Sequence, residues 1–304
     1  RYVLCNKKID LQHYGDGNTD KTFFLIHPEG SGVGLFAYIT IITGHIDYAL
    51  KKGYIPIVDM KNYDNTYLDE NTLGKENAWE YFFKQPSQYS LEDVYSSKNV
   101  IISHGAPYCW PDASVDFCFD KKLRKYWKNI VDKYVVLNDD LNQMVEDQWN
   151  TLFTSEDKIL GVKCRGTDYL KLKPKWHPRQ PEPEEVIKKA RQVMKEQGCN
   201  KIFLSTEDKN IYEMFKKEFG DIVTTNEQMR YDYDGVQYIS VMKSDRENDA
   251  YLQGIEYLIT TLILARCNCF IGGRNGGTVG ALLFTKGYKY EYIWNLNKNY
   301  LNLI

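Results

Sequence analysis

The chain has 304 residues and a formal net charge of -2, with 39 basic and 41 acidic side chains. This length allows a sizeable core and about two domains, and the balanced charge offers no basic surface for nucleic acid. The sequence contains no apolar run of about 18 residues or more, so it predicts no membrane span. Among its seven cysteines, several lie in apolar runs, which favours reduced core thiols over a disulfide framework. We therefore expect a bacterial-type soluble protein of the cytoplasm, at most peripheral to a membrane, and the sequence leaves its oligomeric state open.

The first half of the chain alternates apolar runs with helical periodicity. A glycine-rich loop at 28–34 follows the first apolar run and leads into a helix over about 35–52, which Gly53 ends. Strands are expected at 22–27, 54–59, 99–104 and 134–137. The polar stretch 150–158 is the candidate hinge between two domains.

The second half repeats the alternation more clearly. Strands are expected at 159–164, 201–205, near 222–223, at 236–241 and from Cys269, with helices at 184–196, around 211–219, at 250–265 and at 279–284. Repeated βαβ units of this length imply a parallel sheet with helices on both faces. We therefore predict an α/β fold of two Rossmann-like domains, residues 1–155 and 156–304, with a final helix free to pack back on the first domain.

A permanent cation follows the strand at 159–164, in the sequence Arg165-Gly-Thr-Asp168. In open α/β sheets, ligands bind at the carboxyl edge where such a residue lies. The planar fork of arginine suits a phosphate better than any other side chain does. A surface ion pair between Arg165 and Asp168 is the alternative, and it would be the better interpretation of an isolated arginine.

Two further loops are expected at the same edge. The loop at 205–208 brings Thr206 and Asp208, which a helix N-cap explains equally well. In the loop at 272–277, glycines allow backbone N–H groups to approach an anion at a helix N-terminus, although a tight turn would also require them. Arg274 and Asn275 add donors there. Together with Arg165, this loop predicts a pyrophosphate cradle.

These segments resemble the inverting fucosyltransferases, which include α-1,2-, α-1,6- and protein O-fucosyltransferases. Residues 161–168 are similar to the first motif of that superfamily, 203–208 to the second and 247–278 to the third, while 30–38 resembles its glycine-rich loop. The resemblance implies a GT-B fold, in which two Rossmann-like domains face each other across a cleft. It also implies an acceptor-side first domain, a second domain that binds GDP-fucose, a glycan acceptor and no metal.

The resemblance assigns roles to individual residues. Arg165 matches the arginine that contacts the donor's β-phosphate, and Lys163 stands where many members have histidine near the nucleotide. The predicted donor-binding set is Lys163, Arg165, Thr206, Asp208, Gly273, Arg274, Asn275, Gly276, Gly277 and Thr278. The predicted acceptor set is Gly30, Gly32, Gly34 and His177. Cys267 and Cys269 have no second Cys/His pair at a suitable spacing, so no metal site is predicted.

Transfer from a nucleoside diphosphate builds negative charge on the leaving pyrophosphate, which Arg165, Arg274 and glycine amides can stabilise. The attacking hydroxyl needs a base within hydrogen-bond reach. Glu29 in the glycine-rich loop, Asp168 and His177 are the candidates, although a solvated loop position explains His177 more simply. Arg165, Asp168 and Glu29 form the predicted catalytic set.

Two other classes of protein stay open at this point. Gly30, Gly32 and Gly34 followed by Asp59 mimic a dinucleotide fingerprint, which would make the chain an NAD-dependent oxidoreductase. That pattern is imperfect, because Leu35 occupies its sixth position. A non-catalytic glycan- or nucleotide-binding protein is the third class, because the 24 tyrosines and six tryptophans suit sugar stacking as well as a core. The nucleotide that binds would separate the three.

Overall fold

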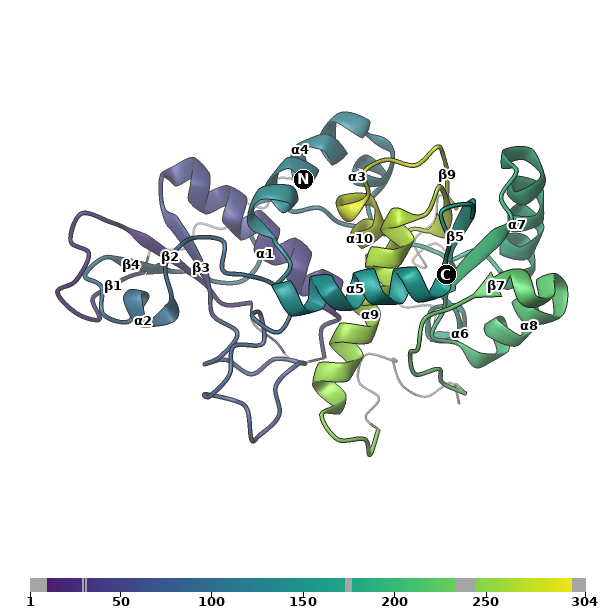
Figure 1. The fold of residues 1–304 in the computed structure, drawn as a ribbon. Coiled ribbons are helices and arrows are strands. Elements are labelled where there is room, and N and C mark those ends of the chain that lie inside the picture. The colour runs from purple at the N-terminus through teal and green to yellow at the C-terminus, as the bar shows by residue number, and fades with distance from the viewer. Residues whose placement is uncertain (1–9, 29, 31, 173–176, 233–243, 297–304) are drawn as a thin grey trace. The chain divides into compact units, whose positions relative to one another are not determined.

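A computed structural model describes residues 10–28, 30, 32–172, 177–232 and 244–296, except for the side chains of Thr167 and Asp168. The chain forms two compact units, each with its own sheet (Figure 1). Unit 1 holds the described residues up to Asp112 together with 122–141 and 247–251, and unit 2 holds 113–121, 142–246 and the described residues from Leu252. The α/β class is confirmed, while a domain boundary at residue 155 stays a prediction.

The sheet of unit 1 has a parallel centre. Its strands are β1 (Leu11–Gln12), β2 (Phe23–Ile26), β3 (Ile55–Val58) and β4 (Val100–Ile102), in the order β1-β4-β2-β3. Only β1 runs antiparallel to its neighbour. The three parallel strands match predicted ones because each is a short apolar run, and β2 is buried along its whole length.

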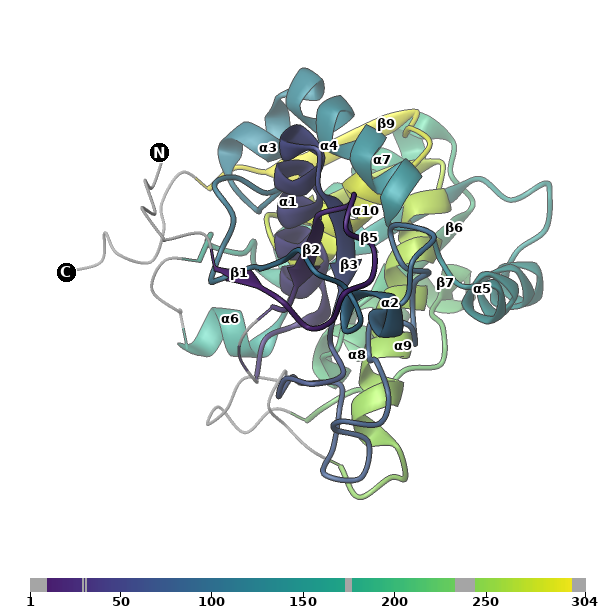
Figure 2. The same cartoon turned by 90° about the vertical axis from the view of Figure 1, so that its left-hand side faces the viewer.

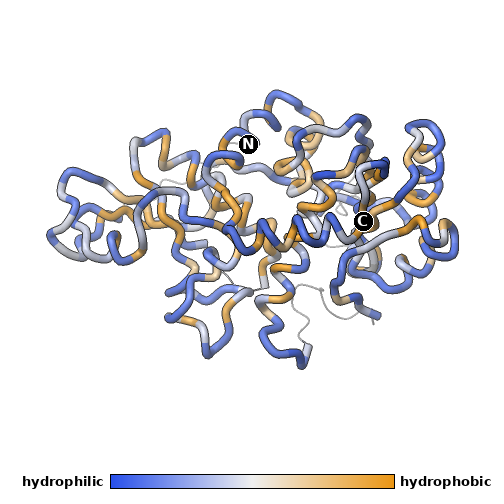
Figure 3. The backbone as a smooth tube through the Cα atoms, in the orientation of Figure 1, coloured by the Kyte–Doolittle hydropathy of each residue, from blue (hydrophilic) through white to orange (hydrophobic). Residues whose placement is uncertain are grey.

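Helix α1 (Leu35–Lys52) packs along β2 and β3 (Figure 2). It ends as predicted at Gly53, whose φ of 72° is the left-handed conformation that glycine adopts without strain. The other helices of unit 1 are α2 (Leu91–Val94) and most of α4 (Lys121–Tyr134). Figure 3 shows hydrophobic stretches along the central strands and hydrophilic ones in the loops and outer helices.

The sheet of unit 2 is entirely parallel. Its strands are β5 (Ile159–Lys163), β6 (Lys201–Ser205), β7 (Val223–Thr224), β8 (Cys269–Gly273) and β9 (Tyr290–Trp294), in the order β7-β6-β5-β8-β9. The chain builds from β5 toward β7 on one side and then returns to β8 and β9 on the other. The topological switch point therefore lies between β5 and β8, where open α/β sheets bind ligands.

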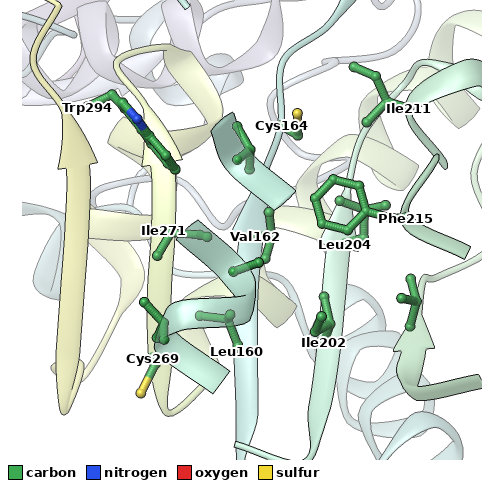
Figure 4. Close-up of a cluster of buried hydrophobic side chains, with 14 residues drawn as sticks. Leu160, Val162, Cys164, Ile202, Leu204, Ile211, Phe215, Cys269, Ile271 and Trp294 are labelled. Carbon is green, nitrogen blue, oxygen red and sulfur yellow. The ribbon is translucent and has the colours of Figure 1, made fainter. Parts of the chain in front are cut away.

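The helices of unit 2 precede or connect these strands. They are α3 (Val115–Phe119), most of α5 (Asp139–Leu152), α6 (Thr167–Leu172), α7 (Pro183–Gln197), α8 (Lys209–Phe219), most of α9 (Asp249–Arg266) and α10 (Gly276–Phe284), with a 3-10 turn at Gly220–Ile222. Alternate residues of β5, Leu160 and Val162, pack into a core with Leu204 and Phe215 (Figure 4). The other residues of β5 point to the opposite face, where a Cβ on Gly161 would lie 3.1 Å from Leu264 of α9.

Several sequence predictions were wrong. The strand predicted at 134–137 does not form, because Tyr134 ends α4 and Leu137 makes only an isolated bridge with Phe83. The run had been interpreted without its upstream helical periodicity, which buries Trp127, Ile130 and Val131. Residues 150–152 of the predicted hinge belong to α5. Elements β1, β9, α2, α3, α4, α5 and α6 were not predicted. The strand expected at 236–241 and any helix after residue 296 lie outside the described residues.

Candidate functional site

Three neighbouring strands of unit 2 end level with one another. Lys163 at the end of β5 pairs in register with Ser205 of β6 on one side and Gly272 of β8 on the other. The residues that follow these strands, including Arg165, therefore lie along one carboxyl edge at the switch point of the sheet. The structure brings together the three loops that the sequence had placed there.

A buried ion cluster lies at the centre of this edge. The side chain of Lys163 is completely buried, and its Nζ donates to Glu207 Oε1 at 2.8 Å and to Ser205 Oγ at 3.2 Å. The Nη1 of Arg165 lies 3.3 Å from the same Glu207 oxygen. Burial would raise the pKa of the Glu207 carboxyl, but the two cations outweigh burial and hold it at about 2. Burial lowers the pKa of Lys163, an effect that Glu207 opposes.

The guanidinium of Arg165 lies over an aromatic ring. Its Cζ is 4.8 Å from the centre of the Tyr169 ring, and its side chain is 14% exposed. Tyr169 in turn hydrogen bonds with His177, its hydroxyl lying 3.2 Å from Nδ1. His177, predicted for the acceptor, therefore lies beside the ring that supports Arg165. The side chain of Asp168 and the whole of Glu29 lie outside the described residues, so their catalytic roles stay predictions.

The loop after β6 begins a helix. The carboxylate of Asp208 accepts from the backbone N–H groups of Asn210 at 2.8 Å and Ile211 at 3.2 Å, which makes it the N-cap of α8. The Thr206 hydroxyl accepts from the N–H of Asp208 at 3.2 Å. These bonds match the capping alternative, and contact of Thr206 or Asp208 with a donor stays a prediction.

The turn from β8 into α10 is held by side-chain amides. Asn275 caps the helix by accepting from the N–H of Thr278 at 3.1 Å, and its Nδ2 donates to Gln180 Oε1 at 3.0 Å. Gln180 donates in turn to the carbonyl of Arg274 at 2.8 Å. The hydroxyl of Thr278 donates to the carbonyl of Gly273 at 2.5 Å. This bonding fixes the N-terminus of α10, whose first amides belong to Gly276 and Gly277.

Close packing explains two of the glycines in this turn. A Cβ on Gly273 would lie 2.9 Å from Pro181 Cδ and closer still to Gln180. A Cβ on Gly277 would lie 2.9 Å from Lys163 Cε and 3.0 Å from the Tyr257 hydroxyl. The buried lysine therefore packs directly against the first turn of α10, where its charge adds to the positive potential of the helix N-terminus.

Arg274 contacts the backbone near α3. Its side chain is buried, with the residue 5% exposed, and its Nη1 lies 3.4 Å from the carbonyl oxygen of Ala113. Contact of Arg274 with the donor stays a prediction.

A pocket of about 550 Å³ opens beside the ends of β6 and β7. Its lining residues are Thr225, Asn226, Glu227, Gln228, Met229, Arg230, Arg246 and Glu256. Asn226 is 3% exposed, and its Nδ2 is buried with no hydrogen-bond partner in the described part of the chain. The Glu256 carboxylate accepts from Arg246 at 2.5 Å and from the N–H of Met229 at 3.2 Å. Gln228 joins the pocket to the site by donating to the carbonyl of Thr206 at 2.8 Å.

Sequence reasoning missed this pocket and Glu207. The polar run after β7 carries a signal, because Asn226 and Gln228 follow a strand end as the other site residues do. Nothing in the sequence showed that α9 would complete the pocket with Glu256.

The glycine-rich loop of unit 1 shows a different kind of geometry. Gly30 and Gly32 have φ values of 109° and 78°, so both need glycine, and Tyr38 donates its hydroxyl to the carbonyl of Gly30. Gly34 precedes α1 with an ordinary φ of -71°, and a Cβ added there would meet no atom within 4 Å. An acceptor role for these glycines stays a prediction.

Asp59 does not support the dinucleotide alternative. Its fully buried carboxylate accepts from the N–H groups of Lys61 at 2.9 Å and Asn62 at 3.1 Å, from Asn62 Nδ2 at 2.9 Å and from the Tyr95 hydroxyl at 2.6 Å. These bonds use the lone-pair sites of both oxygens. The carboxylate therefore stabilises its own turn and has no acceptor position left for a ribose hydroxyl.

Two histidines that the sequence analysis did not select follow β2 and β4. The ring of His27 stacks on Tyr63 at 3.9 Å and lies edge-on to His104 at 6.0 Å. The Nε2 of His104 is 3.5 Å from a carboxylate oxygen of Asp10. The signal was present, because each histidine directly follows or nearly follows a buried strand.

The described residues show neither a membrane-spanning helix nor a cluster of metal ligands. None of their helices combines the length and apolar character that crossing a bilayer requires. In the same residues, no three His, Cys, Asp or Glu side chains gather as a group able to hold a metal ion. Independence from metals stays a prediction.

No protein-family model and no curated protein sequence matches the chain, but solved structures do. The α-1,6-fucosyltransferase NodZ, co-crystallised with GDP, is 14% identical over 87% of this chain and 93% of its own, with a TM-score of 0.53. A structure of the fucosyltransferase NodZ from Bradyrhizobium has a TM-score of 0.52. POFUT1 in complex with GDP is 8% identical over 90% and 99% of the two chains, with a TM-score of 0.52. A mutant of Arabidopsis thaliana FUT1 in complex with GDP is 10% identical over 95% and 73%, with a TM-score of 0.51.

These likenesses show the fold. The chain is an α/β protein with two parallel-rich sheets, of the GT-B fold of fucosyltransferase structures. Identities of this size show the fold alone, so the chemistry of the site must come from the residues of this chain.

Proposed function

We propose that the chain is an inverting glycosyltransferase that transfers L-fucose from GDP-β-L-fucose to a hydroxyl of a glycan. One observation carries this proposal: Arg165, the Lys163–Glu207 pair and the N-terminus of α10 meet at the switch point of a parallel sheet. The fold supports it, because NodZ was soaked with GDP-fucose and POFUT1 was crystallised with it, each with a TM-score of 0.51 to this chain.

The residues at this edge suit departure of a pyrophosphate. Arg165 and the amides of Gly276 and Gly277 stabilise the negative charge that develops as the glycosidic bond breaks, and Lys163 strengthens their field from beneath the helix turn. An acceptor hydroxyl attacks from the opposite face in a single displacement, which inverts the anomeric centre. Glu29 or Asp168 takes the proton of that hydroxyl.

The pocket beside β6 and β7 is our candidate for the nucleobase. The buried Nδ2 of Asn226 offers a donor to a carbonyl oxygen such as O6 of guanine. Oε1 of Glu256, which accepts from Arg246 Nη1, keeps one acceptor position for a ring N–H group. Since Gln228 connects the pocket to the loop of Thr206, one nucleotide can place its base here and its phosphates at the glycine turn.

Nucleotide binding tests the donor. GDP at 100 times its Kd should stabilise the protein by about 2.7 kcal/mol in thermal unfolding, whereas UDP, CMP and NAD should have little effect at the same concentration. Asn226→Ala should weaken GDP, and Asn142→Ala, on the exposed side of α5, is the matched control. Preference for UDP or NAD would reject the donor assignment.

The product tests the mechanism. Incubation with GDP-β-L-fucose and a mixed set of glycans should yield an α-L-fucoside, which the anomeric coupling in an NMR spectrum identifies. A β-linked product would exclude the single displacement. Transfer from UDP- or CMP-sugars alone would exclude fucose as the donor sugar.

A further inference from the structure

One carboxylate oxygen connects the two cations of the site. Glu207 Oε1 accepts from Lys163 at 2.8 Å and lies 3.3 Å from Arg165 Nη1. The closer contact belongs to the lysine, which is completely buried, while the arginine is partly exposed at the sheet edge. Glu207 therefore joins a cation beneath the edge to a cation at its surface.

The second oxygen of this carboxylate lowers the stability of the fold. Oε2 of Glu207 is buried and has no hydrogen-bond partner among the residues that the structure describes. A buried polar atom of this kind lowers stability, so its presence calls for an explanation other than folding. An apolar pair of similar volume would often be at least as stable as the Lys163–Glu207 ion pair.

Direct contact with a ligand at the surface of the edge does not account for the buried carboxylate of Glu207. Its side chain is only 14% exposed, and its Oε1 already accepts from the buried Lys163, which also donates to Ser205. Its other neighbour, Arg165, is held on two sides, by this carboxylate and by the face of Tyr169. Such support from two directions is what a guanidinium needs to meet a phosphate in one fixed orientation.

We propose that Glu207 is a positioning residue that fixes the guanidinium of Arg165 for the second phosphate of a nucleoside diphosphate, with Lys163 as the buried countercharge of Glu207. This inference rests on the proposed function, because it takes Arg165 to be the phosphate ligand. Lys163 carries the stronger pairing, so the carboxylate stays ionised without drawing the guanidinium away from the edge. The three side chains together keep one net positive charge beneath the phosphates.

The ratio of GDP affinity to GMP affinity measures this role without an acceptor. Isothermal titration calorimetry gives both constants, and their ratio reports the recognition of the second phosphate. Arg165→Ala should lower the ratio about 10- to 100-fold, as expected for a lost charge-assisted hydrogen bond. Glu207→Gln should lower it about tenfold, in the range of other residues that orient a ligand-binding group. The affinity for GMP should hardly change in either variant.

A double-mutant cycle shows whether Glu207 acts through Arg165. The variant with both Arg165→Ala and Glu207→Gln should have the ratio of Arg165→Ala alone, because there is no guanidinium left to position. Glu218→Gln is the matched control, since that carboxylate pairs with Arg191 on the surface. Its ratio should equal that of the unmodified protein.

Stability is controlled separately. If Glu207→Gln fails to fold with an unpaired Lys163, the paired change Lys163→Met and Glu207→Gln removes both buried charges at once and should fold. Its GDP-to-GMP ratio should fall at least as far as in Glu207→Gln, because this change also removes the positive charge of Lys163 beside the first turn of α10.

Three outcomes would overturn the inference. They are an unchanged or higher ratio in the Glu207 variants, a parallel loss of GDP and GMP affinity, and additive effects of the two substitutions in the cycle. The proposed function fails in a different way, namely if the unmodified protein does not bind GDP or if Arg165→Ala leaves its affinity unchanged.

Discussion

The carboxyl edges of the two sheets carry different chemistry on the same kind of scaffold. Both sheets have a switch point beside a buried parallel strand, after β2 in unit 1 and after β5 in unit 2. In unit 1, that strand is followed by His27, and Asp59 closes a turn at the next strand. In unit 2, Arg165 and the glycine turn before α10 occupy the equivalent edge.

The difference lies in the few residues after each strand. Imidazoles, tyrosines and a satisfied carboxylate suit neutral hydroxyl groups, whereas an arginine, a buried lysine and helix amides suit an anion. Fold alone would have assigned both edges to nucleotides. The residues after the strands support our proposal that the anion binds in unit 2.

The largest expected effect is the loss of Arg165. Arg165→Ala should lower the turnover of fucosyl transfer by about 100- to 1,000-fold, as removal of a donor to a developing anion does. Arg165→Lys should cost nearly as much, because lysine keeps the charge and loses the fork. The counterpart in unit 1, His104→Asn, should leave GDP affinity unchanged. Equal losses of GDP affinity in both variants would contradict the proposal that only the edge of unit 2 binds the anion.

Acid should affect the two units in different pH ranges. Burial, opposed by the carbonyl of Gly105, lowers the pKa of His45 in unit 1 from 6.5 to about 4. The unfolded chain therefore takes up this proton first, and the free energy of unfolding should fall by about 3 kcal/mol as the pH drops from 6.5 to 4. Urea unfolding at several pH values measures this decrease, and His45→Gln should remove it.

The ion cluster of unit 2 responds at lower pH. The pKa of Glu207, about 2 instead of its ordinary 4.5, means that its carboxylate stabilises the fold above pH 4.5 and loses this effect as the pH falls toward 2. If the free energy of unfolding changed between pH 6.5 and 4.5 and this change disappeared in Glu207→Gln, the assignment would be contradicted.

The two glycine loops should tolerate a methyl group differently. Gly277→Ala should cost about 1 to 3 kcal/mol of unfolding free energy and weaken GDP, because its Cβ would press on Lys163 and Tyr257. Gly34→Ala is the matched control in unit 1, where the space is open, and it should cost no more than about 1 kcal/mol as a change at a helix cap. Thermal unfolding and GDP titration measure both. Equal effects would show that close packing is not what distinguishes the loops.

The smallest expected effect is that of chelation. Arg165 and helix amides can stabilise the leaving group in place of a divalent cation, so transfer should continue in excess EDTA. Activity assays with and without the chelator check this. Complete loss, restored by Mn²⁺, would place the protein in a metal-dependent class.

The sequence predicted the main strands of both sheets and the convergence of the loops that contain Arg165, Asp208 and Gly277. It could do so because buried strands are short apolar runs, and the carboxyl ends of parallel strands share one edge. The strand β9 was not predicted, because polar and aromatic residues are mixed along Tyr290–Trp294 at the edge of the sheet.

The interior of the site could not be predicted in the same way. Glu207 lies between Thr206 and the helix cap Asp208, and only the path of the chain after β6 shows that it faces Lys163. The pocket at Asn226 depends on the packing of α9, whose residues are distant in the sequence. Both features arise from side-chain directions, which spacing alone does not determine.

The burial of Lys163 makes it a natural sensor of local opening. Reagents that acylate amines should modify exposed lysines such as Lys51 quickly and leave Lys163 untouched while β5, β6 and α10 stay packed together. Mass spectrometry of a labelled sample would then show how often this part of the molecule opens, residue by residue. The labelling rate of the Lys163 amine would thus measure how often the site opens locally.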